Sequence, residues 1–169
     1  MSGNQQTGPF DIALYQPDIP GNAGAILRLG ACLGVGVHII EPAGFDLADR
    51  ALKRAGMDYL EVAALTRHLS WEAFEQVRRL SGRRLLLFTT AGDTPYTAFS
   101  YRPGDMLLFG RETSGVPDIV HAAADSRLVI PMPGGGRSLN LAMSAAMAAG
   151  EAARQLSNAA NPPSAAGAW

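Results

Sequence analysis

The 169-residue sequence predicts one α/β domain built on a mostly parallel sheet. Segments of strand length alternate along the chain with segments of helical periodicity, as in chains that build parallel sheets. Several of the strand-like segments are apolar throughout, for example residues 85–88 (LLLF) and 106–109 (MLLF). A continuously apolar strand is typical of a sheet that is covered on both faces. A chain of this length buries roughly two-thirds of the surface that it exposes when unfolded, so it needs no disulfide or metal to fold.

The N-terminal half is expected to open with a strand, a rigid turn and a helix. Residues 10–15 (FDIALY) form the strand, and residues 16–21 (QPDIPG) form the turn. Asn22 can cap the helix that follows, and Gly34 suits the position just after the helix end. The next elements are expected to be a strand at 36–40, a helix at 46–55, a short strand at 60–65 and a helix from its cap Ser70 to about Leu80.

The C-terminal half is expected to continue this alternation up to a long final helix. Pro117 starts a short helix, and an alanine-rich helix runs from Asn140 to about Leu156. The domain therefore spans residues 10–156. The polar residues 1–9 and the Pro- and Ala-rich residues 157–169 are expected to be flexible. The strands of this half are predicted at 85–89, 106–109 and 127–130.

Charge and hydropathy restrict the partners and the location of the protein. The net charge of −1 gives no overall attraction to nucleic acid, so RNA binding needs a local basic cluster or an oligomer that pools its charges. Basic residues do cluster at 50–54 and 78–84, where ordinary solvated helix faces are the alternative explanation. The first nine residues do not resemble a signal peptide, and no apolar run is long enough to cross a membrane. A cytoplasmic protein is expected.

Motifs for metal and hydrolase chemistry are missing from the sequence. The single Cys32 has no second cysteine, which argues against zinc, haem attachment and a disulfide, and it is expected to be a small buried side chain. His38, His68 and His121 follow no HExxH pattern, so core or surface positions suit them better than metal ligation. The Walker, GxGxxG and GxSxG motifs are absent at the positions where they would count. No metal is therefore expected.

Two polar loops that are separated by one strand are the best candidates for a site. They are residues 109–117 (FGRETSGVP) and 130–140 (IPMPGGGRSLN). Their glycine turns can place backbone N–H and C=O groups side by side, in a cleft for a small polar ligand. Glu112 is either a solvated carboxylate or a partner for a cation or a helix N-terminus. Helix capping explains one of Ser138 and Asn140 but not easily both.

Arg28 is the only acidic or basic residue other than His38 between Ile19 and Ile40. It follows the carboxyl end of the first strand, where open α/β sheets bind ligands. A guanidinium at that place could hold a phosphate or a developing oxyanion. The alternative is an arginine that simply extends to water from an apolar helix.

Three ordered motifs resemble those of the SPOUT-class ribose 2′-O-methyltransferases of tRNA and rRNA. The motifs are Asn22 with Arg28, residues 109–117, and residues 130–132 with Ser138-Leu139-Asn140. Within this family the chain is most similar to the small enzymes that modify the wobble nucleotide of tRNA, cytidine 34 or uridine 34, and the match extends over residues 12–156. The resemblance implies a homodimer with a C-terminal trefoil knot, a tRNA anticodon loop as partner, and S-adenosyl-L-methionine as cofactor.

The resemblance also implies which residues hold the cofactor. Backbone groups would bind the edge of the adenine while apolar side chains cover its faces, a mixture that is usual in ligand sites. The residues in question are Phe88, Gly110, Ile130, Met132 and Ser138.

A catalytic set follows from the same motifs. Arg28 is expected to stabilise charge on the ribose oxygen, because a guanidinium is too basic to act as the general base. Asn22 would position Arg28 or the ribose, and Glu112 would orient Arg28. Ser138 and Asn140 would order the third loop.

Two other functions stay open at this point. One is a non-catalytic, knotted RNA-binding dimer, and the other is a 2′-O-methyltransferase that acts at a different tRNA or rRNA site. The intact Arg28 and Ser138-Leu139-Asn140 favour an enzyme. The alanine face of the final helix fits either a dimer interface or packing inside its own subunit; its members are Ala145, Ala148, Ala149 and Ala152.

Overall fold

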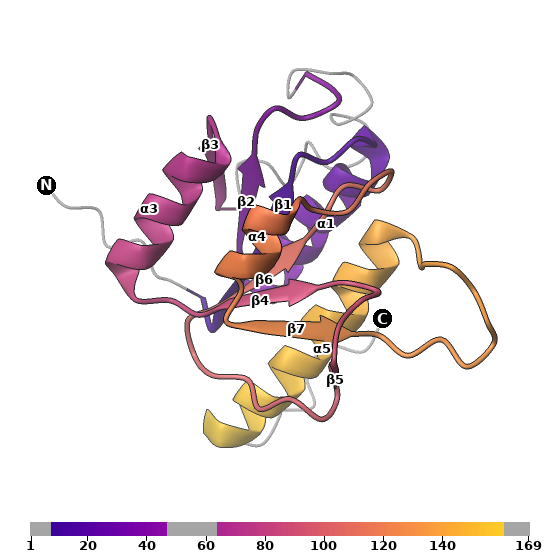
Figure 1. Ribbon diagram of the computed structural model, residues 1–169. Helices are drawn as coiled ribbons and strands as arrows, with labels where there is room; N and C mark the ends of the chain where they lie inside the picture. The colour runs from indigo at the N-terminus through magenta and orange to yellow at the C-terminus, as the bar shows by residue number, and fades with distance from the viewer. Residues whose placement is uncertain (1–7, 47–63, 161–169) are drawn as a thin grey trace, which may run out of the picture.

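The computed structural model describes residues 8–46 and 64–160, which form a seven-stranded sheet with helices on both sides (Figure 1). The strand order is β3-β2-β1-β6-β4-β7-β5, and every pairing between these strands is parallel. The predicted α/β fold with a parallel sheet is thereby confirmed. The strands are β1 (Phe10–Tyr15), β2 (Gly36–Ile40), β3 (Leu65–His68), β4 (Leu85–Phe88), β5 (Thr94–Pro95), β6 (Asp105–Phe109) and β7 (Ser126–Val129).

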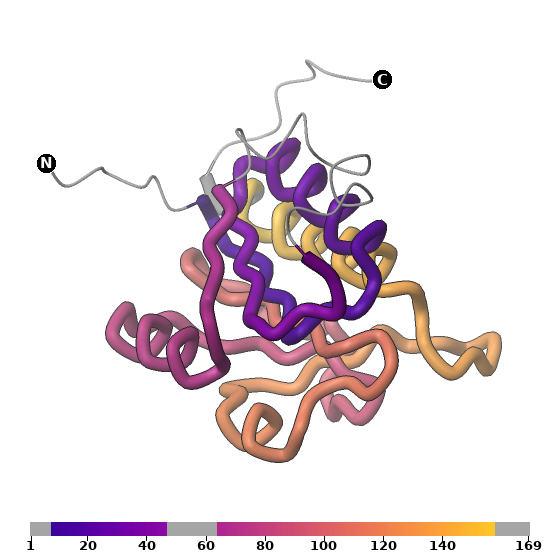
Figure 2. Tube along the Cα trace, turned by 90° about the horizontal axis from the view of Figure 1, so that it is seen from above, coloured from indigo at the N-terminus to yellow at the C-terminus, as the bar shows by residue number. Residues whose placement is uncertain are grey.

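Two layers of helices cover the sheet. Helices α1 (Pro20–Leu33) and α5 (Leu141–Ala160) lie next to each other on one face, and α3 (Trp71–Ser81) and α4 (Asp118–Ala123) lie on the other (Figure 2). This arrangement explains the continuous apolar strands, because the central strands β1, β4 and β6 are buried along their whole length between the two helix layers. No helix in residues 8–46 and 64–160 is long and apolar enough to cross a membrane.

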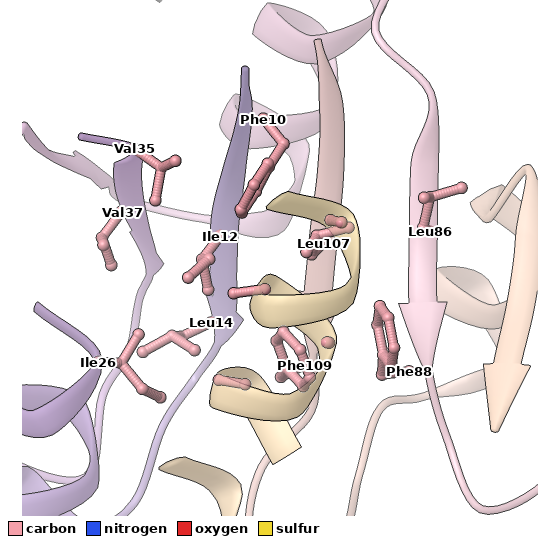
Figure 3. Packing of buried hydrophobic residues seen from close by; sticks show 14 of the residues in the cluster. Phe10, Ile12, Leu14, Ile26, Val35, Val37, Leu86, Phe88, Leu107 and Phe109 are labelled. Carbon is pink, nitrogen blue, oxygen red and sulfur yellow. The ribbon is translucent and has the colours of Figure 1, made fainter. Parts of the chain in front are cut away.

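The side chains of β1 show how the two layers divide the core. Ile12 and Leu14 point to the α1 and α5 side, where they pack with residues such as Phe109 (Figure 3). Ala13 and Tyr15 point to the opposite side and pack under α3. All six residues of the strand are buried. The central strands therefore hold their carboxyl ends, and the loops that leave them, in fixed positions.

Several local signals act as the sequence predicts. Gly34 ends α1 in the left-handed conformation, with φ of 66°. Ser70 caps α3 by accepting a hydrogen bond from the N–H of Ala73 at 3.2 Å. Gly82, which was not singled out from the sequence, ends α3 in the same way as Gly34 ends α1, with φ of 67°.

Other elements differ from the prediction. Helix α1 starts at Pro20, two residues before Asn22, because proline fits the first helical position and its missing N–H costs nothing there. Asn22 is therefore not the cap. Cys32 is exposed rather than buried, because it lies on the side of α1 that faces away from the sheet. The two-residue edge strand β5 was not expected, and α5 continues to Ala160 instead of ending near Leu156.

The basic cluster at 78–84 serves the structure. Its four arginines pair with carboxylates instead of forming an open cationic surface: Arg78 and Arg79 with Glu75, Arg83 with Asp11, and Arg84 with Asp105. The other basic cluster, residues 50–54, lies outside the described residues. So do most of the predicted helix 46–55, most of the predicted strand 60–65, and residues 1–7 and 161–169. The trefoil knot stays a prediction.

Candidate active site

A cavity of about 440 Å³ opens where four neighbouring strands end. Strands β1, β6, β4 and β7 are adjacent in the sheet and parallel, so the loops after them meet at one edge. The volume lies in the range of small-molecule sites. Its lining comes from the start of α1 (Ile19 and Asn22), from residues 87–90, 109–116, 129–130, 132 and 138–141, and from Ser144.

All the residues predicted to hold a cofactor line this cavity. They supply both apolar and polar groups: the ring of Phe88 stacks on Phe109 with 4.8 Å between ring centroids, and Ser138 contributes a hydroxyl. Among the predicted catalytic residues, four also line it. The lining residues are Phe88, Gly110, Ile130, Met132 and Ser138 from the first set and Asn22, Glu112, Ser138 and Asn140 from the second.

The loop after β6 has a shape that only glycines permit. Arg111 and Gly115 exchange both backbone hydrogen bonds at 2.9 Å, which folds the loop back on itself. Gly115 has φ of 67°, a left-handed conformation that favours glycine. A Cβ on Gly110 would lie 2.7 Å from the carbonyl carbon of Gly115, closer than packed atoms tolerate. The two glycines therefore set the position of Glu112 between them.

Glu112 holds the start of α1. Its carboxylate accepts hydrogen bonds from the N–H of Asp18 at 2.8 Å, the N–H of Ile19 at 3.2 Å and the Nδ2 of Asn22 at 3.3 Å. Ile19 is the N-cap residue of α1 and has no polar side-chain atom with which to cap the helix. Glu112 supplies the negative charge that a helix N-terminus favours. It thus fixes the helix that carries Arg28.

Asn22 and Asn140 connect the third loop to the other two. Asn140 donates from Nδ2 to the Oδ1 of Asn22 at 3.0 Å. Its own Oδ1 accepts from the N–H of Ala142 at 2.9 Å and of Met143 at 3.3 Å, so it also caps α5. Glu112, Asn22 and Asn140 form one hydrogen-bonded chain across three loops, which we call the site network.

A second set of contacts at this edge was not predicted from the sequence. Asp18 accepts hydrogen bonds from Arg111, through Nε at 3.2 Å and through Nη2, and from the hydroxyl of Thr113 at 2.7 Å. These bonds, first that from Arg111 and then that from Thr113, hold the pKa of the Asp18 carboxyl below its usual value. The partners lie more than 90 residues apart, and neither Asp18 nor Arg111 belongs to a recognisable local pattern.

Arg28 is the one predicted catalytic residue that lies elsewhere. It is exposed on α1, on the stripe formed with Gly21, Ala25 and Cys32, and it is not among the residues that line the cavity. Because those residues recur every three or four positions, they share one face of the helix. Their exposure indicates that this face points away from the sheet. In the single chain, Arg28 therefore does not line the cavity.

The lining of the cavity suits an organic ligand. Hydroxyl, amide and backbone groups lie beside the apolar side chains of Phe88, Ile130 and Met132. Among residues 8–46 and 64–160, no three His, Cys, Asp or Glu residues lie close enough together to hold a metal ion. S-adenosyl-L-methionine combines an adenine, a ribose and a charged amino-acid group, and these mixed groups fit such a lining.

Comparisons with known proteins point the same way. A protein from Beijerinckia indica named tRNA (cytidine(34)-2'-O)-methyltransferase is 58% identical over 145 residues, which are 86% of this chain and 91% of that protein. A solved structure described as giving insights into the 2-OH methylation of C/U34 on tRNA superposes with a TM-score of 0.85 at 44% identity, covering 89% of this chain and 99% of that one. An AdoMet-bound rRNA methyltransferase from Sinorhizobium meliloti has a TM-score of 0.83 at 29% identity, covering 89% of this chain and 58% of that one.

The model of the SpoU rRNA Methylase family matches residues 9–150, which include β1, the whole cavity lining and half of α5. The match covers the three loops that the site network connects. The chain therefore belongs to the SpoU rRNA Methylase family.

Proposed function

We propose that this protein transfers a methyl group from S-adenosyl-L-methionine to the ribose 2′-hydroxyl of the wobble nucleotide, position 34, of tRNA. The observation that carries the proposal is the 58% identity over most of the chain to a protein named for that reaction. The cavity supports it, since the residues implied for cofactor binding all line one space. The cofactor would supply an electrophilic methyl group on a sulfonium.

The loops after β4, β6 and β7 would hold the cofactor. Phe88, Ile130 and Met132 offer apolar surface, while Gly110 and Ser138 bring backbone and hydroxyl groups to the same cavity. Alignment of the ribose oxygen with the methyl carbon and sulfur would contribute about 7 kcal/mol through proximity. The site network would maintain that alignment, because it fixes the three loops relative to one another.

Arg28 would stabilise the negative charge that develops on the ribose oxygen. A guanidinium has a pKa above about 12 and does not act as a base in proteins. As a donor to the developing oxyanion it could supply about 3 kcal/mol. The proton would pass to a phosphate of the substrate or to water.

The position of Arg28 is explained by a homodimer. Both helices of this layer carry exposed apolar side chains, Leu33 on α1 and Met143 and Met147 on α5, of which the two methionines are 63% and 41% exposed. Such a surface on two adjacent helices fits a second copy of the chain. Arg28 lies on the exposed stripe of α1, so in a dimer it would serve the cavity of the partner subunit.

The opposite face of α5 does not serve this interface. Its alanines allow α5 to lie close to the sheet and to α1, and all four are fully buried within the single chain. Of the two explanations for this alanine face, packing inside its own subunit is therefore the one that the structure supports. The buried residues are Ala145, Ala148, Ala149 and Ala152.

An assay with tritiated S-adenosyl-L-methionine and tRNA transcripts tests the proposed reaction. We expect label to be transferred, and mass spectrometry of nuclease digests to locate it on the ribose of nucleotide 34. A transcript that already carries a 2′-O-methyl group at position 34 should accept no label. Label on another tRNA position or only on ribosomal RNA would replace the proposed substrate, and cofactor binding without any transfer would identify a non-catalytic RNA-binding protein.

Mixed dimers test the role of Arg28. The variant Arg28→Lys should bind S-adenosylhomocysteine normally in calorimetry and lose most methyl transfer, because a point charge cannot replace the planar fork. A dimer of Arg28→Ala with a cavity variant such as Asn140→Ala should regain part of the activity, since one of its two sites then combines intact residues. If the mixture is as inactive as its parents, Arg28 does not act across the interface.

A further inference from the structure

Asp18 and Arg111 form an ion pair beside the cavity, between the β1–α1 loop and the loop after β6. Arg111 donates through Nε and Nη2 to the Oδ1 of Asp18, and through Nη1 to the Oε1 of Gln16 at 3.3 Å. Thr113 donates to the other oxygen of Asp18 through its hydroxyl and its backbone N–H. Both oxygens of one carboxylate are therefore occupied by residues of the opposite loop.

The two residues that bind Asp18 flank Glu112 in the sequence. Arg111 precedes Glu112, Thr113 follows it, and both bind Asp18. In the reverse direction, the carboxylate of Glu112 binds the backbone N–H groups of Asp18 and Ile19. The two loops thus hold each other through two carboxylates, one from each side.

The pair is partly shielded from water. The side chain of Asp18 is 15% exposed and that of Arg111 is 34% exposed. Hydrogen bonds between charged groups are shorter and stronger than neutral ones, and an arginine adds directional preference that a lysine lacks. The ion pair therefore fixes where the loop after β6 lies, in addition to holding it against the β1–α1 loop.

We propose that Asp18 and Arg111 are positioning residues for the methyl transfer, a role that rests on the proposed function. They act through Glu112: by fixing residues 111–113 against residues 16–19, they hold the Glu112 carboxylate at the start of α1. Asn22 and Asn140, which are bonded in sequence to Glu112, are then held over the cavity. Neither Asp18 nor Arg111 needs to touch the reacting atoms.

Three variants test the proposal: Arg111→Lys, Asp18→Asn and the double variant. Each single change should lower kcat about tenfold or more, because small displacements of aligned groups cost that much in rate. The KM for tRNA and the affinity for S-adenosylhomocysteine should stay within about twofold, since the residues expected to hold the cofactor, Phe88, Gly110, Ile130, Met132 and Ser138, are unchanged. The kcat of the double variant should be no lower than that of the less active single variant, because both changes break the same contact.

Arg127→Lys is the matched control. Arg127 pairs with Asp93 at 3.7 Å, with both side chains largely exposed, and it does not line the 440 Å³ cavity. This variant should keep the wild-type kcat. Wild-type turnover in both single variants, losses that multiply in the double variant, or a change confined to the KM for tRNA would each overturn the positioning role.

Hydrogen exchange separates this proposal from the proposed function. The amide N–H groups of Asp18 and Ile19 should exchange faster in Arg111→Lys than in the wild type, because Glu112 then holds them less tightly. This readout does not require turnover. If the wild type methylates no RNA, the proposed function fails, while faster exchange would still support the linkage between the loops and unchanged exchange would refute it.

Discussion

Two hydrogen-bonded networks of polar side chains in this protein contain similar residue types but lie in different surroundings. The site network joins Glu112, Asn22 and Asn140 at the carboxyl ends of the strands and lines a cavity. The second network, which we call the α3-side network, joins Asp11, His38, His68 and Arg83 across β1, β2 and β3 beneath α3. None of its four members lines the 440 Å³ cavity. We therefore expect a functional role for the site network, beside which a ligand has space, and a structural role for the α3-side network.

The α3-side network neutralises its carboxylate with cationic and ring donors. Asp11 accepts hydrogen bonds from Arg83, from the Nε2 of His38 at 3.2 Å and from the N–H of Gly36 at 2.8 Å. Burial raises the pKa of Asp11, but the bonds from His38 and Arg83 outweigh it and bring the pKa to about 2. Glu112, in contrast, is held by two backbone N–H groups and an amide.

His68 completes the α3-side network as a neutral ring. Its Nε2 lies 2.9 Å from the Nδ1 of His38, and its ring packs nearly perpendicular to the Phe74 ring. A neutral His38 that donates from Nε2 to Asp11 accepts from His68 at Nδ1, whereas a protonated His38 donates from both ring nitrogens, to Asp11 and to His68. Burial, and then the nearby His38, lower the pKa of His68 to about 4.

The largest effect is expected from Gly110→Ala. The new methyl group would overlap the backbone of Gly115, so the loop that carries Glu112 must move. A displacement of this kind should reduce methyl transfer by a factor of about one hundred or more and weaken S-adenosylhomocysteine binding in calorimetry. Gly134→Ala is the control, because a Cβ there meets nothing within 4 Å. Normal methyl transfer by Gly110→Ala would indicate that activity does not depend on the site network any more than on the α3-side network.

Glu112→Gln should separate activity from stability. The amide keeps the shape of the carboxylate, but its NH2 group would face a backbone N–H that now lacks an acceptor. Loss of this bond should misalign the site and raise the activation free energy of methyl transfer by about 1–3 kcal/mol. This corresponds to roughly a ten- to hundredfold loss of kcat. Single-turnover assays and thermal unfolding of the same samples would check this. If the variant unfolds at a lower temperature but its folded molecules keep the wild-type kcat, the role of Glu112 is structural.

Asp11→Asn is the corresponding change in the α3-side network. It leaves the buried charge of Arg83 without its counter-ion, which should lower the free energy of unfolding by about 2 kcal/mol. Turnover per folded molecule should not change, because Asp11 lies outside the cavity. Urea unfolding and the methyl-transfer assay measure the two quantities. A tenfold loss of kcat with normal stability would contradict the structural role.

The smallest effect is the pH dependence that His68 gives to stability. The folded pKa is lower than that of the unfolded chain, so the unfolded chain binds the proton first. The stabilisation is therefore complete above pH 6.5 and is lost as the pH falls towards 4. Between pH 6.5 and 5.5 the loss should be about 1 kcal/mol. Asp11 contributes in a separate window, because its stabilisation is lost only between about pH 4 and 2.

His68→Gln checks that assignment. Glutamine can still donate to His38 but does not titrate, so the decline of stability between pH 6.5 and 5.5 should become shallower. Urea unfolding at five pH values across this range would measure both slopes. Equal slopes in the two proteins would assign the proton uptake to another group.

Local signals predicted most of the fold. The apolar strands, the glycines after α1 and α3 and the Ser70 cap are visible in short windows of sequence, and the structure follows them. Asn22 shows where such windows fail. Its residue type suits a cap, yet Pro20 moves the helix start forward and frees the Asn22 amide for the site network.

The two polar loops of the candidate site were predictable from their glycines and polar residues, and its individual residues from the motifs of a family. Phe88, Gly110 and Ser138 were found in that way, and they do line one cavity. Asp18 and Arg111 were missed because their pairing spans 93 residues and neither residue is distinctive alone. The exposed position of Cys32 was missed as well, because composition cannot tell which side of an apolar helix faces the sheet.

The separation between Asn22 and Asn140 has a consequence for biosynthesis. Their hydrogen bond joins residues 118 positions apart, and Asn140 is followed at once by α5. A nascent chain on the ribosome cannot close the cavity until nearly all of the domain has been translated. Products of premature termination, even ones that contain every strand of the sheet, would lack the ligand-binding loops in their assembled form.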